Sequence, residues 1–137
     1  MRYVFAWLAL AVAVIVGFGS FNWLSYRRLA LRGVRVGATV VELLPKDHNT
    51  MRYTYTVGGR SFTGKMQSRA PNPPLEQIQV TQSVVIYYDP EYPEISVAGD
   101  PVPILKNETI TIALGVLMFP TLLVVVWAAK RTTRSAV

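Results

Sequence analysis

The sequence predicts a membrane protein of mixed α and β structure, in which two transmembrane helices flank a small antiparallel β-domain of about five strands. We expect this domain to be β-barrel-like or a curled sheet. Two uncharged runs, 4–24 and 110–129, contain 17 apolar residues of 21 and 16 of 20. Between them, apolar and polar side chains alternate with the two-residue period of a half-buried strand. This uneven distribution excludes a single soluble globule, although 137 residues would suit one domain.

Each apolar run is long enough to cross a bilayer, because 20 helical residues span about 30 Å. A buried core helix is the alternative, but the remaining residues are too few to enclose two helices that are apolar on every side. A cleaved signal peptide is the alternative for the first run, since Arg2 precedes it. That run is longer than the usual signal-peptide core and lacks an A-x-A-like cleavage site, so we predict an uncleaved span.

The first predicted span carries small residues at every fourth position, Ala9, Ala13 and Gly17. Such a face allows the backbone of another helix to approach closely. We consider this face a candidate for helix packing, against either the second span or another subunit. Small residues are also common in any apolar helix, which is the alternative explanation.

The predicted organisation has seven parts. They are an N-terminal tail (1–3), transmembrane helix 1 (4–24), a basic juxtamembrane segment (25–33), the β-domain (34–100), a linker (101–109), transmembrane helix 2 (110–129) and a basic C-terminal tail (130–137).

Two spans place both termini on one side of the membrane, and basic residues flank the spans on both sides. The tails hold four basic residues and no acid, whereas the 85 residues between the spans hold ten basic and eight acidic ones. Because charges in so long a loop influence orientation weakly, we expect cytoplasmic termini and an extracytoplasmic β-domain. The predicted location is the plasma (inner) membrane, as a multi-pass protein.

Four arginines follow the first span and are candidates for binding lipid headgroups: Arg27, Arg28, Arg32 and Arg35. If the helix continues beyond the membrane, Arg28, Arg32 and Arg35 share one face, and Gly33 ends the helix. Anionic headgroups attract such basic clusters. The alternative is a solvated turn whose arginines only set the depth of the helix.

The middle of the chain predicts strands separated by turns. Residues 34–40 and 51–57 alternate apolar and polar side chains, and Gly58-Gly59 has the spacing of a two-residue hairpin leading into 60–67. Prolines between residues 71 and 74 predict a loop, because proline cannot donate to a ladder. Further strands are expected over about 83–88 and 94–98, on either side of a tight turn.

Three stretches of this region form a recognisable combination: Gly37–Glu42, the aromatic hairpin Tyr53–Gly64, and Val84–Glu94 with its Tyr-Asp-Pro-x-x-Pro pattern. Together they resemble the DUF3592 family of small membrane proteins. The resemblance covers roughly residues 33–100 and implies a small β-domain with flanking spans. It implies no activity and no catalytic residue. The chain has Thr81-Gln82 where the family often has Gly-Asp before the fourth strand.

The residues do not predict an enzyme, a cofactor or a metal site. The single histidine, His48, lies in a polar turn beside Asp47, and no nucleophile is indicated near it. One histidine and no cysteine leave only carboxylates as metal ligands. Asp89, Glu91 and Glu94 are a weak candidate for a hard cation, without the EF-hand pattern.

Nucleic-acid binding is not expected, because the region between the spans carries a net charge of only +2 and lacks a basic stripe. Tyr53 and Tyr55 share parity with core residues, whereas Tyr87 and Tyr92 are candidates for contact with a protein partner. We therefore expect a non-catalytic protein-interaction or scaffolding subunit of the cell envelope.

The expected partners are the lipid bilayer and either another protein or a second copy of the chain. An immunity-like or envelope-stress accessory protein is the alternative. A membrane-tethered enzyme or ligand sensor would need a concave polar pocket.

Overall fold

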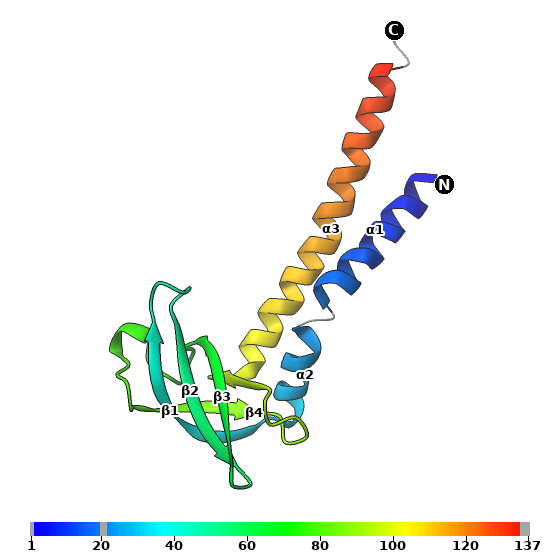
Figure 1. Ribbon diagram of the computed structural model, residues 1–137. Coiled ribbons are helices and arrows are strands. Elements are labelled where there is room, and N and C mark those ends of the chain that lie inside the picture. Colours follow the sequence, from blue (N-terminus) through cyan, green and yellow to red (C-terminus); the bar gives the residue numbers. More distant parts are fainter. Residues whose placement is uncertain (1, 20–21, 135–137) are drawn as a thin grey trace. The chain divides into compact units, whose positions relative to one another are not determined.

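The computed structural model describes residues 2–19 and 22–134, and contacts divide the chain into a helical unit and a β-domain (Figure 1). The helical unit holds the residues up to Leu24 and those from Lys106 onward. The β-domain spans Ser25–Leu105. The helices are α1 (Arg2–Gly19), α2 (Trp23–Arg32), the 3₁₀ helix η1 (Leu75–Gln77) and α3 (Pro101–Arg134).

One helix of the described chain is long and apolar enough to cross a membrane. It covers Pro101–Trp127 of α3, and its most apolar 18-residue window has a mean hydropathy of 2.4 and is only 6% buried. This low burial distinguishes it from the core helix of a soluble protein, which is mostly buried. The apolar part of α1, Val4–Gly17, is shorter. Of the two predicted spans, the second therefore meets the length and apolarity criteria, and the first is not confirmed.

The first predicted span, 4–24, is not one continuous helix. Helix α1 ends at Gly19 and α2 begins at Trp23, while residues 20 and 21 lie outside the described chain. Asn22, the described residue before α2, lies in a turn.

The predicted linker 101–109 is helical, since α3 begins at Pro101. Asp100 accepts a hydrogen bond from the Val102 N–H at 2.9 Å, and proline suits the first helical position because its φ is already helical. The helix continues to Arg134, into the predicted tail 130–137, of which 135–137 lie outside the described residues. Residue 1 of the N-terminal tail also lies outside them.

Within the helical unit, two tryptophans connect to α3. Trp7 Nε1 donates to Thr121 Oγ1 at 3.1 Å, and Trp23 Nε1 donates to Thr109 Oγ1 at 3.0 Å. Trp7 belongs to α1 and Trp23 is the first residue of α2, and the later tryptophan bonds to the earlier threonine, so the chain from α1 to Trp23 runs antiparallel to α3. The amino end of α1 and the carboxyl end of α3 consequently lie at the same end of this unit.

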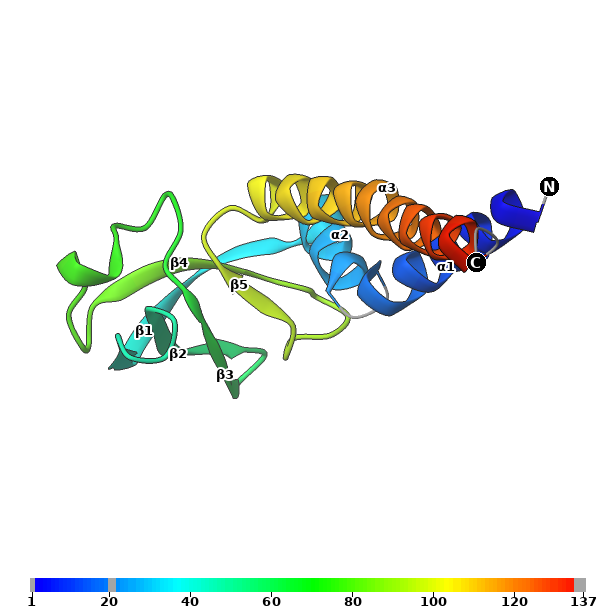
Figure 2. The ribbon, with the colours of Figure 1, turned by 90° about the horizontal axis from the view of Figure 1, so that it is seen from above.

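The β-domain is a curled five-stranded antiparallel sheet, as predicted (Figure 2). Its strands, in chain order, are β1 (Val34–Leu44), β2 (Thr50–Val57), β3 (Arg60–Gln67), β4 (Ser83–Tyr88) and β5 (Ser96–Ala98). Their spatial order is β3-β2-β1-β4-β5. The first half of β1 pairs with β4 and the second half with β2, with a bulge between Val40 and Glu42. The two outer strands, β3 and β5, approach each other without forming a ladder.

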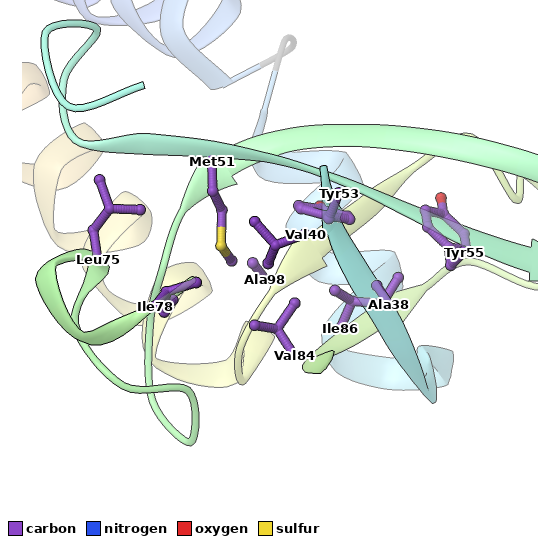
Figure 3. Close-up of a cluster of buried hydrophobic side chains, with 10 residues drawn as sticks. All are labelled: Ala38, Val40, Met51, Tyr53, Tyr55, Leu75, Ile78, Val84, Ile86 and Ala98. Atoms are coloured by element: carbon purple, nitrogen blue, oxygen red, sulfur yellow. The ribbon is translucent and has the colours of Figure 1, made fainter. Parts of the chain in front are cut away.

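The inner face of the sheet holds the main core (Figure 3). It is formed by Ala38, Val40, Met51, Tyr53, Tyr55, Leu75, Ile78, Val84, Ile86 and Ala98. Strands β1, β2 and β4 contribute alternate residues, as the two-residue period predicts. The prediction that Tyr53 and Tyr55 are core residues is confirmed, with exposed fractions of 0% and 3%.

A second, smaller core lies on the opposite face of the sheet. Leu29 of α2, Val97 of β5 and Ile104 of α3 are all buried there, and Tyr87 packs against them. Tyr87 and its neighbour Ile86 point to opposite faces, as successive residues of a strand must. Helix α2 from Ser25 onward and the first turn of α3 are therefore part of the β-domain.

The turns use left-handed backbone conformations where the chain reverses. Gly58 and Gly59 have φ values of 56° and 79°, which confirms the two-residue hairpin. Thr81 also has a positive φ, 74°, before β4. Its N–H donates to the Val40 carbonyl at 2.7 Å, so the turn is held against β1. A β-branched residue in this conformation is strained, by about 1–2 kcal/mol.

We expect Thr81→Gly to raise the free energy of unfolding by up to about 1 kcal/mol, because glycine removes the steric strain but loses more backbone entropy on folding. Thermal unfolding of the full chain in detergent, followed by the near-ultraviolet circular dichroism of the tyrosines, measures the effect. Thr56→Gly is the control, since Thr56 is exposed in β2, and should lower stability. A loss of stability in Thr81→Gly comparable to the control would contradict strain at Thr81.

Candidate functional site

The turn between β4 and β5, residues 89–95, is built around a buried carboxylate. The Asp89 side chain is 0% exposed, the one buried charged residue in the described chain. It accepts hydrogen bonds from Arg32 Nη2 at 2.9 Å and from the Glu91 N–H at 3.0 Å. Arg32 also forms an ion pair with Glu91. The last residue of α2 is thereby joined to a turn 57 positions later.

Opposing effects act on the pKa of Asp89. Burial raises this pKa, whereas the hydrogen bonds from Arg32 and the Glu91 N–H, with the charges of Arg32 and Arg28, lower it. The lowering effects are larger, so the pKa of Asp89 lies below its ordinary value. Hydrogen bonds to Glu91 and Asp89 raise the pKa of Arg32. Asp89 is therefore a carboxylate at neutral pH, and its role is to hold α2 and the turn together.

Two core tyrosines, on the inner face of the sheet, form hydrogen bonds to the end of this turn and the start of β5. The Tyr53 hydroxyl lies 3.1 Å from Ser96 Oγ, and the Tyr55 hydroxyl donates to the Pro93 carbonyl at 2.5 Å. Gly64 in β3 makes room for the first contact, because a Cβ there would lie 2.4 Å from the Tyr53 ring. Burial raises the pKa of Tyr53 to about 12. Both hydroxyls therefore stay protonated at neutral pH and serve as structural hydrogen-bonding groups.

Of the two tyrosines predicted to contact a partner, only Tyr92 is exposed. Its exposed fraction is 42%, and the Arg28 guanidinium lies over its ring, 4.9 Å from the centroid. Tyr87 is half-buried against the second core. The candidate pair is therefore separated, because β4 ends between the two residues.

The four candidate lipid-binding arginines do not lie together on one surface either. Arg32 is committed to Asp89 and Glu91, and Arg28 stacks on Tyr92. Arg27 is exposed on α2. Gly33 ends the helix, as predicted, with its N–H donating to the Leu29 carbonyl at 2.9 Å. Arg35 consequently lies in β1, which corrects the prediction that Arg28, Arg32 and Arg35 share a helical face.

The small-residue face of α1 that was predicted for helix packing is not covered by the rest of this chain. Ala9, Ala13 and Gly17 are all exposed, and no atom lies within 4 Å of where a Cβ on Gly17 would be. Ala11, on another face, is 5% exposed. The second apolar helix therefore does not cover the predicted packing face, and its packing against another subunit stays a prediction.

The outer edge of β3 is a second surface feature. This strand is eight residues long and ends the sheet. The two-residue hairpin makes Val57 and Arg60 a hydrogen-bonded pair, and such pairs alternate along an antiparallel ladder. The backbone N–H and C=O groups of Ser61, Thr63 and Lys65 therefore point away from β2. In the described chain, no backbone hydrogen bond from a turn or loop reaches this edge.

The side chains of the main core pack against one another. Two shallow hollows of about 220 and 240 Å³ lie on either side of Leu75 and Glu76. His48 is exposed in a turn, with Nδ1 3.3 Å from Asp47 Oδ1. Among residues 2–19 and 22–134, no three His, Cys, Asp or Glu side chains gather as metal ligands.

Sequence reasoning did not find the Arg32–Asp89 ion pair. Arg32 was one of several basic residues after an apolar run, and Asp89 stood in a turn that favours aspartate for local reasons. One signal was available: an acid directly after a strand that is apolar on both faces, Val84–Tyr88, starts from a buried position. A buried carboxylate needs a partner, but the sequence does not identify which arginine supplies it.

The lowered pKa of Asp89 predicts acid sensitivity. Since the folded pKa is below the unfolded value of about 3.9, the carboxylate stabilises the fold above that pH, and this contribution is lost as pH falls through the folded pKa. Asp89→Asn should therefore destabilise the protein at pH 7 and differ less from wild type as pH falls below about 4. Solvent reaches Arg32, so we expect a loss nearer 1 kcal/mol than the roughly 3–5 kcal/mol of a fully buried pair.

Thermal unfolding of the full chain across this pH range measures the difference. Asp47→Asn is the matched control, because Asp47 also pairs with a cation, Lys65, but is half exposed. Its effect at pH 7 should be smaller than that of Asp89→Asn. A constant difference between Asp89→Asn and wild type at all pH values would contradict the assigned role of the carboxylate.

Comparison with known proteins identifies the region that contains this site. The profile of a domain of unknown function, DUF3592, matches residues 24–103. No curated protein and no solved structure matches the chain. The match begins within α2 and ends within the first turn of α3, so it includes the main core, Leu29 and Val97 of the second core, and the Arg32–Asp89 ion pair. The chain therefore belongs to the DUF3592 family.

Proposed function

We propose that this protein spans the plasma (inner) membrane twice and displays its DUF3592 domain on the extracytoplasmic side. There it acts as a non-catalytic interaction or scaffolding subunit of the cell envelope. The proposal adds a second span, an orientation and a role to the candidate span in α3.

The properties of α1 support a second span. Its 18 residues make a helix about 27 Å long, close to the thickness of the hydrocarbon core. Large apolar side chains on several sides are exposed, among them Val4, Phe5 and Val16 at 61%, 69% and 62%. Water would oppose such exposure, whereas lipid would favour it. The hydrogen bond from Trp7 to Thr121 gives α1 a neighbour in α3.

The basic tails support cytoplasmic termini, following the rule that positive residues flank spans on the cytoplasmic side. A reporter active only in the cytoplasm, fused after Val137, should therefore be active. The same reporter inserted at the exposed Gly58-Gly59 hairpin should be silent. An active hairpin fusion with a silent C-terminal fusion would show the opposite orientation. The same reporter fused at the N-terminus tests the number of spans, because activity at only one of the two termini would exclude two spans.

The unpaired edge of β3 is the observation that carries the interaction role. An edge strand presents a row of free N–H and C=O groups that can pair with a strand from another chain. Eight residues is a long edge for so small a sheet. The strand contains two basic side chains, Arg60 and Lys65, of which Lys65 pairs with Asp47; long basic side chains on an edge discourage indiscriminate pairing. We propose that the partner adds a strand here.

Thr63→Pro tests this edge directly. Proline removes an N–H that points away from β2, so the fold should survive with little loss of stability while strand addition is blocked. Thr63→Val is the matched control, because it changes the side chain and keeps the N–H. We expect the partner to co-purify from native membranes in mild detergent with wild type and Thr63→Val, at several-fold lower yield with Thr63→Pro.

Near-ultraviolet circular dichroism shows whether Thr63→Pro remains folded. Equal recovery of the same partner by a folded Thr63→Pro chain would refute strand addition at this edge. Recovery of nothing by the wild type, including a second copy of the chain, would count against the interaction role itself.

A further inference from the structure

The two outer strands of the sheet, β3 and β5, run in the same direction. Every neighbouring pair in the order β3-β2-β1-β4-β5 is antiparallel, so the first and the last strand must be parallel to each other. They approach each other without forming a ladder. We call their two facing edges the seam. One further strand in the seam would be antiparallel to both neighbours and would continue the pattern of the whole sheet.

Unpaired backbone groups face the seam from both sides. The Gly99 N–H donates to the Val85 carbonyl at 3.1 Å, so Gly99 and every second residue before it pair with β4. The N–H and C=O groups of Ser96 and Ala98 therefore point away from β4, toward the seam. On β3, the groups of alternate residues from Ser61 onward point away from β2. No backbone hydrogen bond among the described residues joins β3 to β5.

Two tyrosine side chains of β2 close the seam in place of backbone bonds. The Tyr53 hydroxyl lies 3.1 Å from Ser96 Oγ, and the Tyr55 hydroxyl donates to the Pro93 carbonyl at 2.5 Å. A Cβ on Gly64 would lie 2.4 Å from the Tyr53 ring. The ring therefore passes beneath β3, and its hydroxyl reaches the other side of the seam.

The seam is firmly joined at one end only. Beyond the ends of β3 and β5, the Asp100 N–H donates to the Ala70 carbonyl at 2.8 Å, and a Cβ on Gly99 would lie 2.5 Å from the Arg69 carbonyl oxygen. Toward the β2–β3 hairpin, the tyrosine bonds hold the two sides together. Such bonds stabilise weakly, because water offers the same groups other partners. The seam can therefore open from the hairpin end.

We infer that the partner's strand inserts between β3 and β5, antiparallel to both, and completes a closed barrel. This inference rests on the strand addition proposed above and adds the second edge, the direction and the side chains of the partner segment. Because neighbouring strands lie about 4.8 Å apart, the two edges must separate to about 10 Å, which breaks the tyrosine bonds. The core-facing residues of the inserted strand are small, because Tyr53 and Tyr55 already lie beneath this edge.

Photocross-linking in native membranes distinguishes insertion from addition to β3 alone. A benzophenone amino acid replaces either Thr63, exposed on β3, or Glu94, exposed directly after Pro93, in the full-length chain. Thr56, exposed in β2, is the control position. We expect the same partner to be cross-linked from positions 63 and 94 at similar yield, and not from position 56.

Tyr55→Phe tests whether the tyrosine bonds oppose insertion. The variant keeps the ring, which stacks on Phe62, and removes the bond to Pro93. The yield of cross-linked partner should rise about fivefold, because one hydrogen bond contributes about 1 kcal/mol net. Tyr88→Phe is the matched control: its ring packs 6.1 Å from that of Tyr55, and among the described residues no bond from its hydroxyl to β5 is found. It should leave the yield unchanged.

Ser96→Ala, which releases the Tyr53 hydroxyl, should raise the yield in the same way and keeps the test decisive if Tyr55→Phe unfolds. A purely structural role of these bonds would lower the yield in both variants and would overturn the inference. Cross-linking from position 63 without position 94 would also overturn it, while leaving strand addition at β3 in place. Cross-linking from neither position would instead refute the strand addition itself, which separates the two failures.

Discussion

The ion pair between Arg32 and Asp89 is the contact on which the packing of α2 against the β4–β5 turn depends. It joins the end of α2 to the turn between β4 and β5, and it neutralises a carboxylate with no solvent exposure. Without the guanidinium, the carboxylate would have to be protonated or the turn would have to open, because an unpaired buried charge is costly. The same turn receives the Tyr55 hydroxyl at Pro93, so it is held from both sides of the sheet.

The short connections to the helices impose a second constraint. Only Gly33 separates α2 from β1, and only Gly99 and Asp100 separate β5 from α3. Gly33 has no space for a side chain, because a Cβ would lie 2.3 Å from the Leu29 carbonyl oxygen. Leu29 and Ile104 are thereby brought to one face of the sheet, where Val97 and Tyr87 complete the second core. A domain of this size gains stability by recruiting helical residues to a second buried face.

Much of the sheet could be predicted because its information is local. Alternation in Met51–Val57, the Gly58-Gly59 pair and the parity of Val84, Ile86 and Tyr88 each depend on neighbours in the chain. The second core could not be predicted in the same way, since Leu29, Val97 and Ile104 are far apart in sequence and none belongs to a periodic run. The start of α3 was missed because Lys106, Asn107 and Glu108 interrupt the apolar pattern, although a helix tolerates them readily outside the membrane. The turn at Asn22 is a backbone feature that hydropathy alone does not register.

The different positions of the arginines follow from helical phase. Arg27 and Arg28 are adjacent in sequence, but a helix turns by about 100° per residue, so they point in different directions. Arg28 shares its side with Arg32 and meets the acidic turn, whereas Arg27 shares its side with Leu31 and remains exposed. A count of basic residues treats them as one cluster. Their directions divide them into a pair that faces the acidic turn and one arginine that lies beside the exposed Leu31.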